Sequence, residues 1–185
     1  AGLVAALNVV LVLITIVGGR IVPAFTGNAL RASGSQVALR STPLVERLVL
    51  LAMLAMLISD IVQPAGWATM TIAAIAAVLQ LWRLAGWRGW HTTRQPIVWV
   101  LHLAYLWLPL GLGLKAAWLA GSVGFAAPWQ HARGAGAAGM LILAVKTRAS
   151  LGHTGRPLTV HTSIAFAYGL LALAVVVRVF GPAFL

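Results

Sequence analysis

Cysteine is missing from the 185-residue sequence, and its absence excludes several kinds of chemistry. The chain can form no disulfide, no thiolate metal site, no cysteine nucleophile and no covalent attachment of a c-type haem. Any metal that this chain holds must therefore be bound by histidine, methionine, tyrosine, carboxylate or amide groups.

Acidic residues are nearly missing too, since only Glu46 and Asp60 stand against 13 lysine and arginine residues. The sequence offers no pair of catalytic carboxylates. It also lacks the GxxxxGK(S/T) phosphate-binding motif, the Rossmann glycine pattern and the HExxH zinc motif. The sequence therefore assigns no catalytic mechanism and leaves open whether the protein is an enzyme.

Charged residues of both signs make up only 8% of the chain, whereas 61% is hydrophobic and the mean hydropathy is +0.97. A soluble domain is about 25% charged, so this chain has too little polar surface to cover a water-exposed fold. We expect an integral membrane protein whose main partner is the lipid bilayer.

The net charge of +11 raises the alternative of a nucleic-acid-binding protein. The basic residues, however, mostly lie between apolar runs instead of forming one patch. This placement is typical of topology signals and of contacts with anionic lipid headgroups, so we expect no nucleic-acid partner.

Apolar runs of about 20 residues are long enough to cross a bilayer as helices, in which every backbone amide is paired internally. The sequence contains about six such runs, near residues 2–19, 44–62, 65–82, 97–119, 129–147 and 161–180. We therefore predict an all-α fold, a polytopic transmembrane helix bundle of about six spans that forms a single domain over residues 1–185.

Basic residues mark alternate connections between these runs. The connections after spans one, three and five carry Arg20, Arg31, Arg40, Arg83, Arg88, Arg94, Lys146, Arg148 and Arg156. The positive-inside rule places these three connections in the cytoplasm, and Arg178 is the one arginine on the other side.

Charged and aromatic residues near span ends have simple interpretations. Lys115 and Lys146 are expected to extend their ammonium groups to the interface, and Glu46 and Asp60 lie close to helix ends, where a charge costs little. Most tryptophans fall near span ends and predict an aromatic interface belt: Trp67, Trp82, Trp87, Trp90, Trp118 and Trp129.

Small residues fill positions 134–139 of span five. They predict a central helix, because glycine and alanine let neighbouring helices approach closely. Close approach to a flat cofactor is the alternative.

His102 is the strongest candidate for a functional residue, because it lies about a turn and a half inside span four. Tyr105 follows at i+3 and Pro109 at i+7, so the three share one helix face, and the proline offers a place for a bend. A neutral imidazole can bind a metal through one nitrogen while the other makes a hydrogen bond, which makes His102 a candidate metal ligand. The alternative is a buried histidine that only hydrogen-bonds a neighbouring helix.

His131 opens span five on the outer side and is the second candidate metal ligand. An interfacial histidine beside Trp129 is the alternative. At a rise of about 1.5 Å per residue, His102 and His131 lie too far apart to bind one metal. We therefore expect them to serve different sites or to pair with ligands outside this chain.

The polar stretch TRASLGHTGRPL at 147–158 lies between two apolar runs. Gly152 and Gly155 permit a tight turn, and Arg156 can form a bidentate pair with a carboxylate or a propionate. His153 and Arg156 are therefore candidates for anchoring a cofactor at the inner rim, while an ordinary turn between helices is the alternative.

Three stretches together resemble a known family: GGRIVPAFTGNAL at 18–30, LHLAYLWLPLGL at 101–112 and HARGAGAAGMLILAVKTRASLGHTGRPL at 131–158. Their order and spacing are similar to the C-terminal half of the NnrS family of bacterial inner-membrane proteins, over essentially the whole chain. The sequence departs from the family pattern at Arg133 and Gly134, which replace Leu-Thr, and at Lys146, which replaces methionine.

The resemblance implies a role in the bacterial response to nitric oxide and nitrosative stress, with haem b and copper bound by histidines. It implies that His102 and His131 are metal ligands, that His153 and Arg156 anchor a cofactor, and that Tyr105 supports the site. The family is expected to have about twelve spans. An N-terminal half outside this chain, or another chain, is then an expected partner, and nitric oxide is an expected ligand.

Two other functions stay open at this point. A bundle with a proline in one span and glycines in another could carry a small solute or a metal ion as a transporter. The chain could also be a structural membrane subunit that binds no cofactor.

Overall fold

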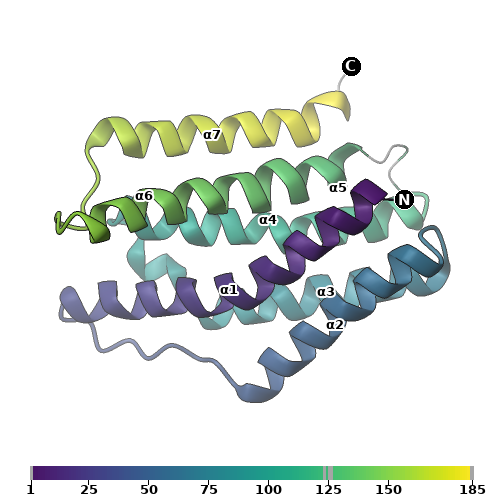
Figure 1. Ribbon diagram of the computed structural model, residues 1–185, viewed down its shortest axis with the longest axis horizontal. Helices are drawn as coiled ribbons and strands as arrows, with labels where there is room; N and C mark the ends of the chain where they lie inside the picture. Colours follow the sequence, from purple (N-terminus) through teal and green to yellow (C-terminus); the bar gives the residue numbers. More distant parts are fainter. Residues whose placement is uncertain (1, 123, 125–126, 184–185) are drawn as a thin grey trace.

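The computed structural model describes residues 2–122, 124 and 127–183, and helices make up most of these segments. Its elements are α1 (Gly2–Ala32), α2 (Pro43–Val62), α3 (Trp67–Gly86), the 3₁₀ helix η1 (Gly89–Thr92), α4 (Pro96–Leu119), α5 (Ala127–His131), the π-helix η2 (Ala132–Met140), α6 (Leu141–His153), α7 (Thr162–Phe180) and the 3₁₀ helix η3 (Gly181–Ala183). The long helices lie side by side and alternate in direction, so α1 begins and α7 ends at the same end of the bundle (Figure 1). The predicted all-α bundle is confirmed.

Four helices, α1, α3, α4 and α7, are long and apolar enough to cross a membrane. The other two predicted spans are helical but differ in kind. Helix α2 has 20 residues, yet it carries Glu46, Arg47 and Asp60. The fifth predicted span is divided into α5, η2 and α6. The structure therefore supports four apolar spans instead of six, because charge in one segment and a change of helix type in the other reduce their apolar length.

Helix α4 lies at the centre of the bundle. Of its most apolar 18 residues, 61% are buried, compared with 17% in α7. It packs against α1, α3, α5, η2, α6 and α7. Buried apolar side chains run along its length, including Leu101, Ala104, Leu108 and Leu112.

The π-helix η2 packs against α4 through small residues. A Cβ atom added at Gly136 would overlap the indole of Trp107, so the backbone of η2 reaches van der Waals contact with that ring. The prediction that span five is a central, closely packed helix is confirmed by this contact. The π-helical winding of its first half was not predicted. π-helical segments are rare in proteins, and many of those that exist lie at functional sites.

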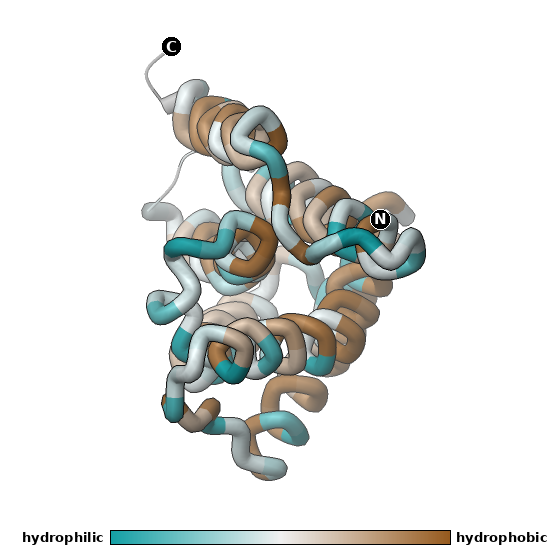
Figure 2. The backbone as a smooth tube through the Cα atoms, turned by 90° about the vertical axis from the view of Figure 1, so that its left-hand side faces the viewer, coloured by the Kyte–Doolittle hydropathy of each residue, from teal (hydrophilic) through white to brown (hydrophobic). Residues whose placement is uncertain are grey.

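The outer faces of the helices carry exposed apolar side chains, as expected for a surface in contact with lipid. Examples on four helices are Leu13, Leu51, Ile58, Val78, Phe166 and Leu173. Figure 2 looks along the helices, and hydrophilic colours gather in the connections while the helices are mostly hydrophobic.

The three basic connections gather at one end of the bundle, as their alternation predicts (Figure 1). Arg40 N–H donates to Gly86 O at 2.9 Å, which joins the first connection to the end of α3. Gln95 Nε2 donates to Ala29 O at 3.5 Å, which joins the start of α4 to the end of α1. We call this the basic end of the molecule and the other the far end. The cytoplasmic location of the basic end stays a prediction.

Two interpretations of residues near span ends are wrong. Lys115 does not extend to the interface, because its side chain is buried in an ion pair with Asp60 on α2. Trp87 and Trp129 do not belong to an interface belt, because both rings are buried inside the bundle. Trp67 and Trp82 are exposed and fit the belt.

Candidate functional site

His102 lies six residues after the first residue of α4, near the basic end, and is half-buried. Its Nε2 lies 2.8 Å from the hydroxyl of Thr26 on α1. The single hydroxyl hydrogen of Thr26 is donated to Val22 O at 2.7 Å. Thr26 must therefore accept from His102, and the network assigns the ring proton to Nε2. His102 Nδ1 makes no hydrogen bond to the described residues, so its lone pair is free among them.

The backbone of Gly89 in η1 lies beside this free nitrogen. A Cβ atom at Gly89 would overlap Cγ and Nδ1 of His102, so only a glycine leaves room there. Arg88, just before it, has the left-handed backbone conformation at φ 51°, which directs the chain into η1. The backbone of Gly89 therefore packs directly against the His102 ring.

His102 also lines an apolar pocket of about 400 Å³ between α3, η1 and α4. The other lining residues are Leu81, Leu84, Ala85, Gly89, Trp90, Thr93, Trp99, Leu103 and Leu106. Among them His102 is the one side chain that can ligate a metal. The pocket thus combines an apolar wall with a single imidazole.

Tyr105 lies on the same face of α4 and is fully buried. The indole of Trp87 connects the two residues, with its ring centroid 4.7 Å from Tyr105 and 6.3 Å from His102. Edge-on aromatic contacts of this kind restrict ring orientation. Trp87 therefore restricts the orientation of the His102 and Tyr105 rings relative to each other. The sequence did not predict this role.

Tyr105 belongs to a buried polar group that we call the Arg83 cluster: Thr15, Glu46, Gln80, Arg83 and Tyr105. The Tyr105 hydroxyl donates to Gln80 Oε1 at 2.6 Å and accepts from Arg83 Nη1 at 2.9 Å. Arg83 also donates to Thr15 O at 2.8 Å and to Glu46 Oε1 at 3.0 Å, and Nη2 pairs with the second carboxylate oxygen. Gln80 Nε2 donates to Thr15 Oγ1 at 3.1 Å.

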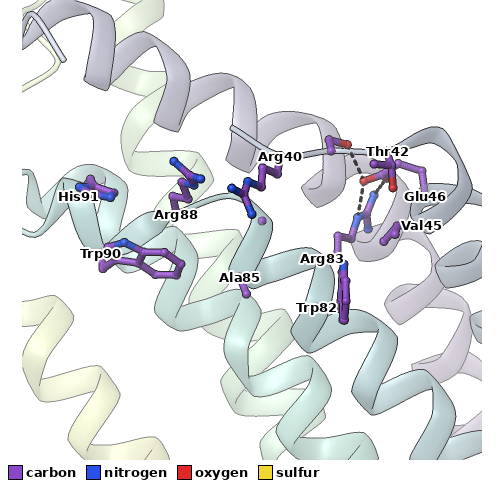
Figure 3. A pocket seen from close by; sticks show the side chains of 12 residues that line it. Arg40, Thr42, Val45, Glu46, Trp82, Arg83, Ala85, Arg88, Trp90 and His91 are labelled. Atoms are coloured by element: carbon purple, nitrogen blue, oxygen red, sulfur yellow. Dashed lines mark hydrogen bonds and ion pairs between the residues drawn. The ribbon is translucent and has the colours of Figure 1, made fainter. Parts of the chain in front are cut away.

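The ion pair of Arg83 and Glu46 lies at one side of a pocket of about 620 Å³ at the basic end (Figure 3). Because Arg83 is buried and Glu46 belongs to a different helix, the pair ties α3 to α2. Glu46 was expected to need no special role, and the structure gives it one. The scarcity of acids was the available signal, since a rare carboxylate inside an apolar chain usually has a partner.

The stretch at 18–30 lines this site from α1. A Cβ atom at Gly18 would lie 3.3 Å from the Tyr105 ring, and one at Gly19 would overlap the Arg83 guanidinium. Thr26 holds His102. Glycines are therefore placed where α1 approaches the polar side chains of α3 and α4.

His131 lies at the end of α5, at the far end of the bundle from His102 (Figure 1). Arg178 Nε donates to His131 Nδ1 at 3.3 Å in an exposed contact. In the segments that the structure describes, no group of three His, Cys, Asp or Glu side chains could hold a metal. The structure therefore does not bring His102 and His131 together, in agreement with the spacing argument.

His153 and Arg156 are exposed at the turn that follows α6. Gly155 has φ 64°, and Arg156 N–H donates to Leu151 O at 3.0 Å, which is the Schellman arrangement at a helix C-terminus. The predicted tight turn is confirmed. The anchoring role of His153 and Arg156 stays a prediction.

A second buried polar group lies toward the far end, and we call it the Arg133 cluster: Asn8, Asp60, Lys115, Trp129 and Arg133. Lys115 forms an ion pair with Asp60 Oδ1, and Asn8 Nδ2 donates to Asp60 Oδ2 at 2.6 Å. Arg133 Nη2 donates to Asn8 Oδ1. The sequence did not reveal this cluster, because its members come from separate helical segments that are distant in the chain.

The family of the chain follows from comparison with known proteins. The family model described as NnrS protein matches residues 1–185. No curated protein and no solved structure matches the chain. Together with the apolar helices that line His102, the match over the full sequence shows that this membrane protein belongs to the NnrS family.

Proposed function

We propose that this chain acts in the bacterial inner membrane in the response to nitric oxide, and that it binds haem b through His102. One observation carries the haem proposal: His102 lines an apolar pocket, and its Nδ1 makes no hydrogen bond to the described residues. The family membership supports the nitric-oxide response.

The residues present fit a haem group. A cofactor with a large apolar surface suits the pocket between α3, η1 and α4, which both Gly89 and His102 line. A chain without cysteine cannot attach a c-type haem covalently, so a haem bound here would be noncovalent, as haem b is. When bound, the haem would supply an iron that coordinates nitric oxide.

The protein's own part is to hold the imidazole. Thr26 accepts from Nε2, which fixes the tautomer and raises the ability of Nδ1 to donate to a metal. Trp87 and Gly89 limit rotation of the ring. Tyr105 acts through Trp87 as a positioning residue.

Copper has a weaker basis in this chain. His131 Nδ1 already accepts from Arg178, and the guanidinium places a positive charge next to any cation that binds there. The described residues supply no cluster of further ligands. A copper site at His131 would need ligands from another chain, so we derive no step through copper.

An absorption spectrum tests the haem proposal. Purified protein in detergent should show a Soret band that shifts when nitric oxide is added. His102→Ala should lose most of that band, because the free lone pair disappears. His91→Ala is the matched control, since His91 is exposed in neighbouring η1. An unchanged band in His102→Ala removes His102 as the ligand. Absence of any band in the wild type, with solute uptake into liposomes, would support the transporter instead.

Gly89→Ala tests the geometry without removing the imidazole. The new methyl group would overlap the His102 ring, so haem affinity should fall by about tenfold or more. Gly113→Ala is the control, because a Cβ atom there meets nothing within 4 Å. Equal haem content in the two variants would contradict the proposed approach beside Gly89.

A further inference from the structure

The Arg133 cluster contains more positive than negative charge. Arg133 is 0% exposed, Lys115 is 1% exposed and Asp60 is 6% exposed. Lys115 is in direct ion pairing with Asp60, whereas Arg133 contacts the neutral amide of Asn8. A guanidinium keeps its proton even when buried. Two cations therefore share one carboxylate in a region closed to bulk water.

Three donor nitrogens in this cluster have no acceptor among the described residues: Arg133 Nε, Arg133 Nη1 and Trp129 Nε1. Trp129 precedes Arg133 by one helical turn, and its ring centroid lies 5.1 Å from Arg133 Cζ and 4.8 Å from Lys115 Nζ. The unused donors and both cations thus converge around one indole. A buried charge with unused donors is costly unless a counter-charge accompanies it.

The surrounding backbone is shaped to hold Arg133. A Cβ atom at Gly111 of α4 would overlap the Arg133 side chain at Cγ, so a glycine makes space for the arginine at the helix crossing. Arg133 is the second residue of the π-helix η2, a winding that occurs often at functional sites. The absence of a side chain at Gly111 and the π-helical winding of η2 therefore both accommodate Arg133.

We propose that the Arg133 cluster binds one small monovalent anion. Arg133 and Trp129 supply the donors, and Lys115 adds positive potential. A single negative charge balances the cluster, whereas a divalent anion would reverse its sign. A lipid headgroup is too large for donors that are wholly buried. The site is separate from His102 and does not depend on the proposed haem.

Chloride is the probe for this site. Detergent-solubilised protein should bind radiolabelled chloride with a stoichiometry of one per chain in equilibrium dialysis. At constant ionic strength, replacing gluconate with chloride should raise Tm saturably, by about 3 to 6 °C at ten times the dissociation constant. Absence of both effects in the wild type overturns the proposal.

Two neutralising variants locate the site. Arg133→Leu and Lys115→Met each balance the charge of Asp60, so each should abolish or strongly weaken chloride binding and the chloride-dependent rise in Tm. Arg133→Lys keeps the charge and should retain part of the response. Arg20→Leu removes an exposed arginine and serves as the control with unchanged chloride binding.

Chloride bound elsewhere on the protein would behave differently in these variants. Binding that persists in Arg133→Leu and in Lys115→Met would overturn the assignment to the Arg133 cluster. If Arg133→Leu does not fold, Lys115→Met still decides the question. The Soret spectrum should be the same with chloride and with gluconate, so failure here leaves the haem proposal untouched.

Discussion

The two buried polar clusters use similar residues at opposite ends of the bundle, yet only one of them is balanced. In the Arg83 cluster one cation meets one carboxylate, and each guanidinium nitrogen has an acceptor. In the Arg133 cluster two cations share Asp60, and Arg133 Nε and Nη1 lack acceptors among the described residues. With two acids in the whole chain, each one decides the charge balance of its own cluster.

The difference also concerns what each cluster can do. A fully paired network in a low-dielectric interior stiffens the helices that contribute to it. The Arg83 cluster therefore provides a rigid support next to His102. An unbalanced network retains capacity for one more charged group, which is why the Arg133 cluster is the better candidate for a ligand.

Asp60→Asn should cause the largest loss of stability. The change leaves Lys115 and Arg133 buried without a carboxylate, and breaking a buried pair in this way costs about 3–5 kcal/mol. The Tm in detergent should fall by about 6–20 °C at about 2–4 °C per kcal/mol. Chloride should restore part of this loss. A fall in Tm no larger than that of a surface variant such as Arg20→Leu would contradict the assignment of a buried, charge-unbalanced cluster around Asp60.

Tyr105→Phe should have an intermediate effect of about 1–3 kcal/mol on the free energy of unfolding, because Gln80 Oε1 loses its donor inside the bundle. Arg83 keeps its bond to Thr15 O, which limits the loss. Thermal unfolding measures the change. Tyr168→Phe is the matched control, since the buried Tyr168 hydroxyl has no partner among the described residues and its removal should be nearly neutral.

Glu46→Gln should have the smallest effect, about 1 kcal/mol, because the Glu46 side chain is 32% exposed and water screens the pair. The glutamine oxygen can still accept from Arg83. The Tm should therefore fall by only a few degrees and should gain chloride dependence, because the variant leaves Arg83 without its counter-charge. A loss equal to that of Asp60→Asn would show that exposure does not distinguish the two ends.

The sequence predicted features that depend on local periodicity. Apolar runs located the helices, alternating basic residues predicted that three connections share one end, and helical spacing placed His102 and Tyr105 on one face. The turn at Gly155 followed from the conformational freedom of glycine. Each of these depends on residues close together in the chain.

Features that depend on contacts between distant helices were not predicted. Glu46 meets Arg83 and Asp60 meets Lys115 across 37 and 55 residues, and nothing in the local pattern selects these partners. The role of Gly89 depends on the ring that approaches it from α4. Only four of the six predicted spans are shown as long apolar helices, for a related reason. Hydrophobic length alone reveals neither the pairing of Glu46 and Asp60 of α2 inside the bundle nor the π-winding of η2.

The backbone hydrogen bond between Arg40 and Gly86 also influences how α2 is rotated about its axis relative to α3. Arg40 lies six residues before Glu46, and Gly86 lies three residues after Arg83. The hydrogen bond between Arg40 and Gly86 therefore sets the positions of both side chains of the ion pair. One extra residue in the helical part between Pro43 and Glu46 would rotate the carboxylate by about 100° around α2 relative to Pro43 and carry it away from the guanidinium. The length of the segment from 40 to 46 therefore helps to set how α2 docks against α3.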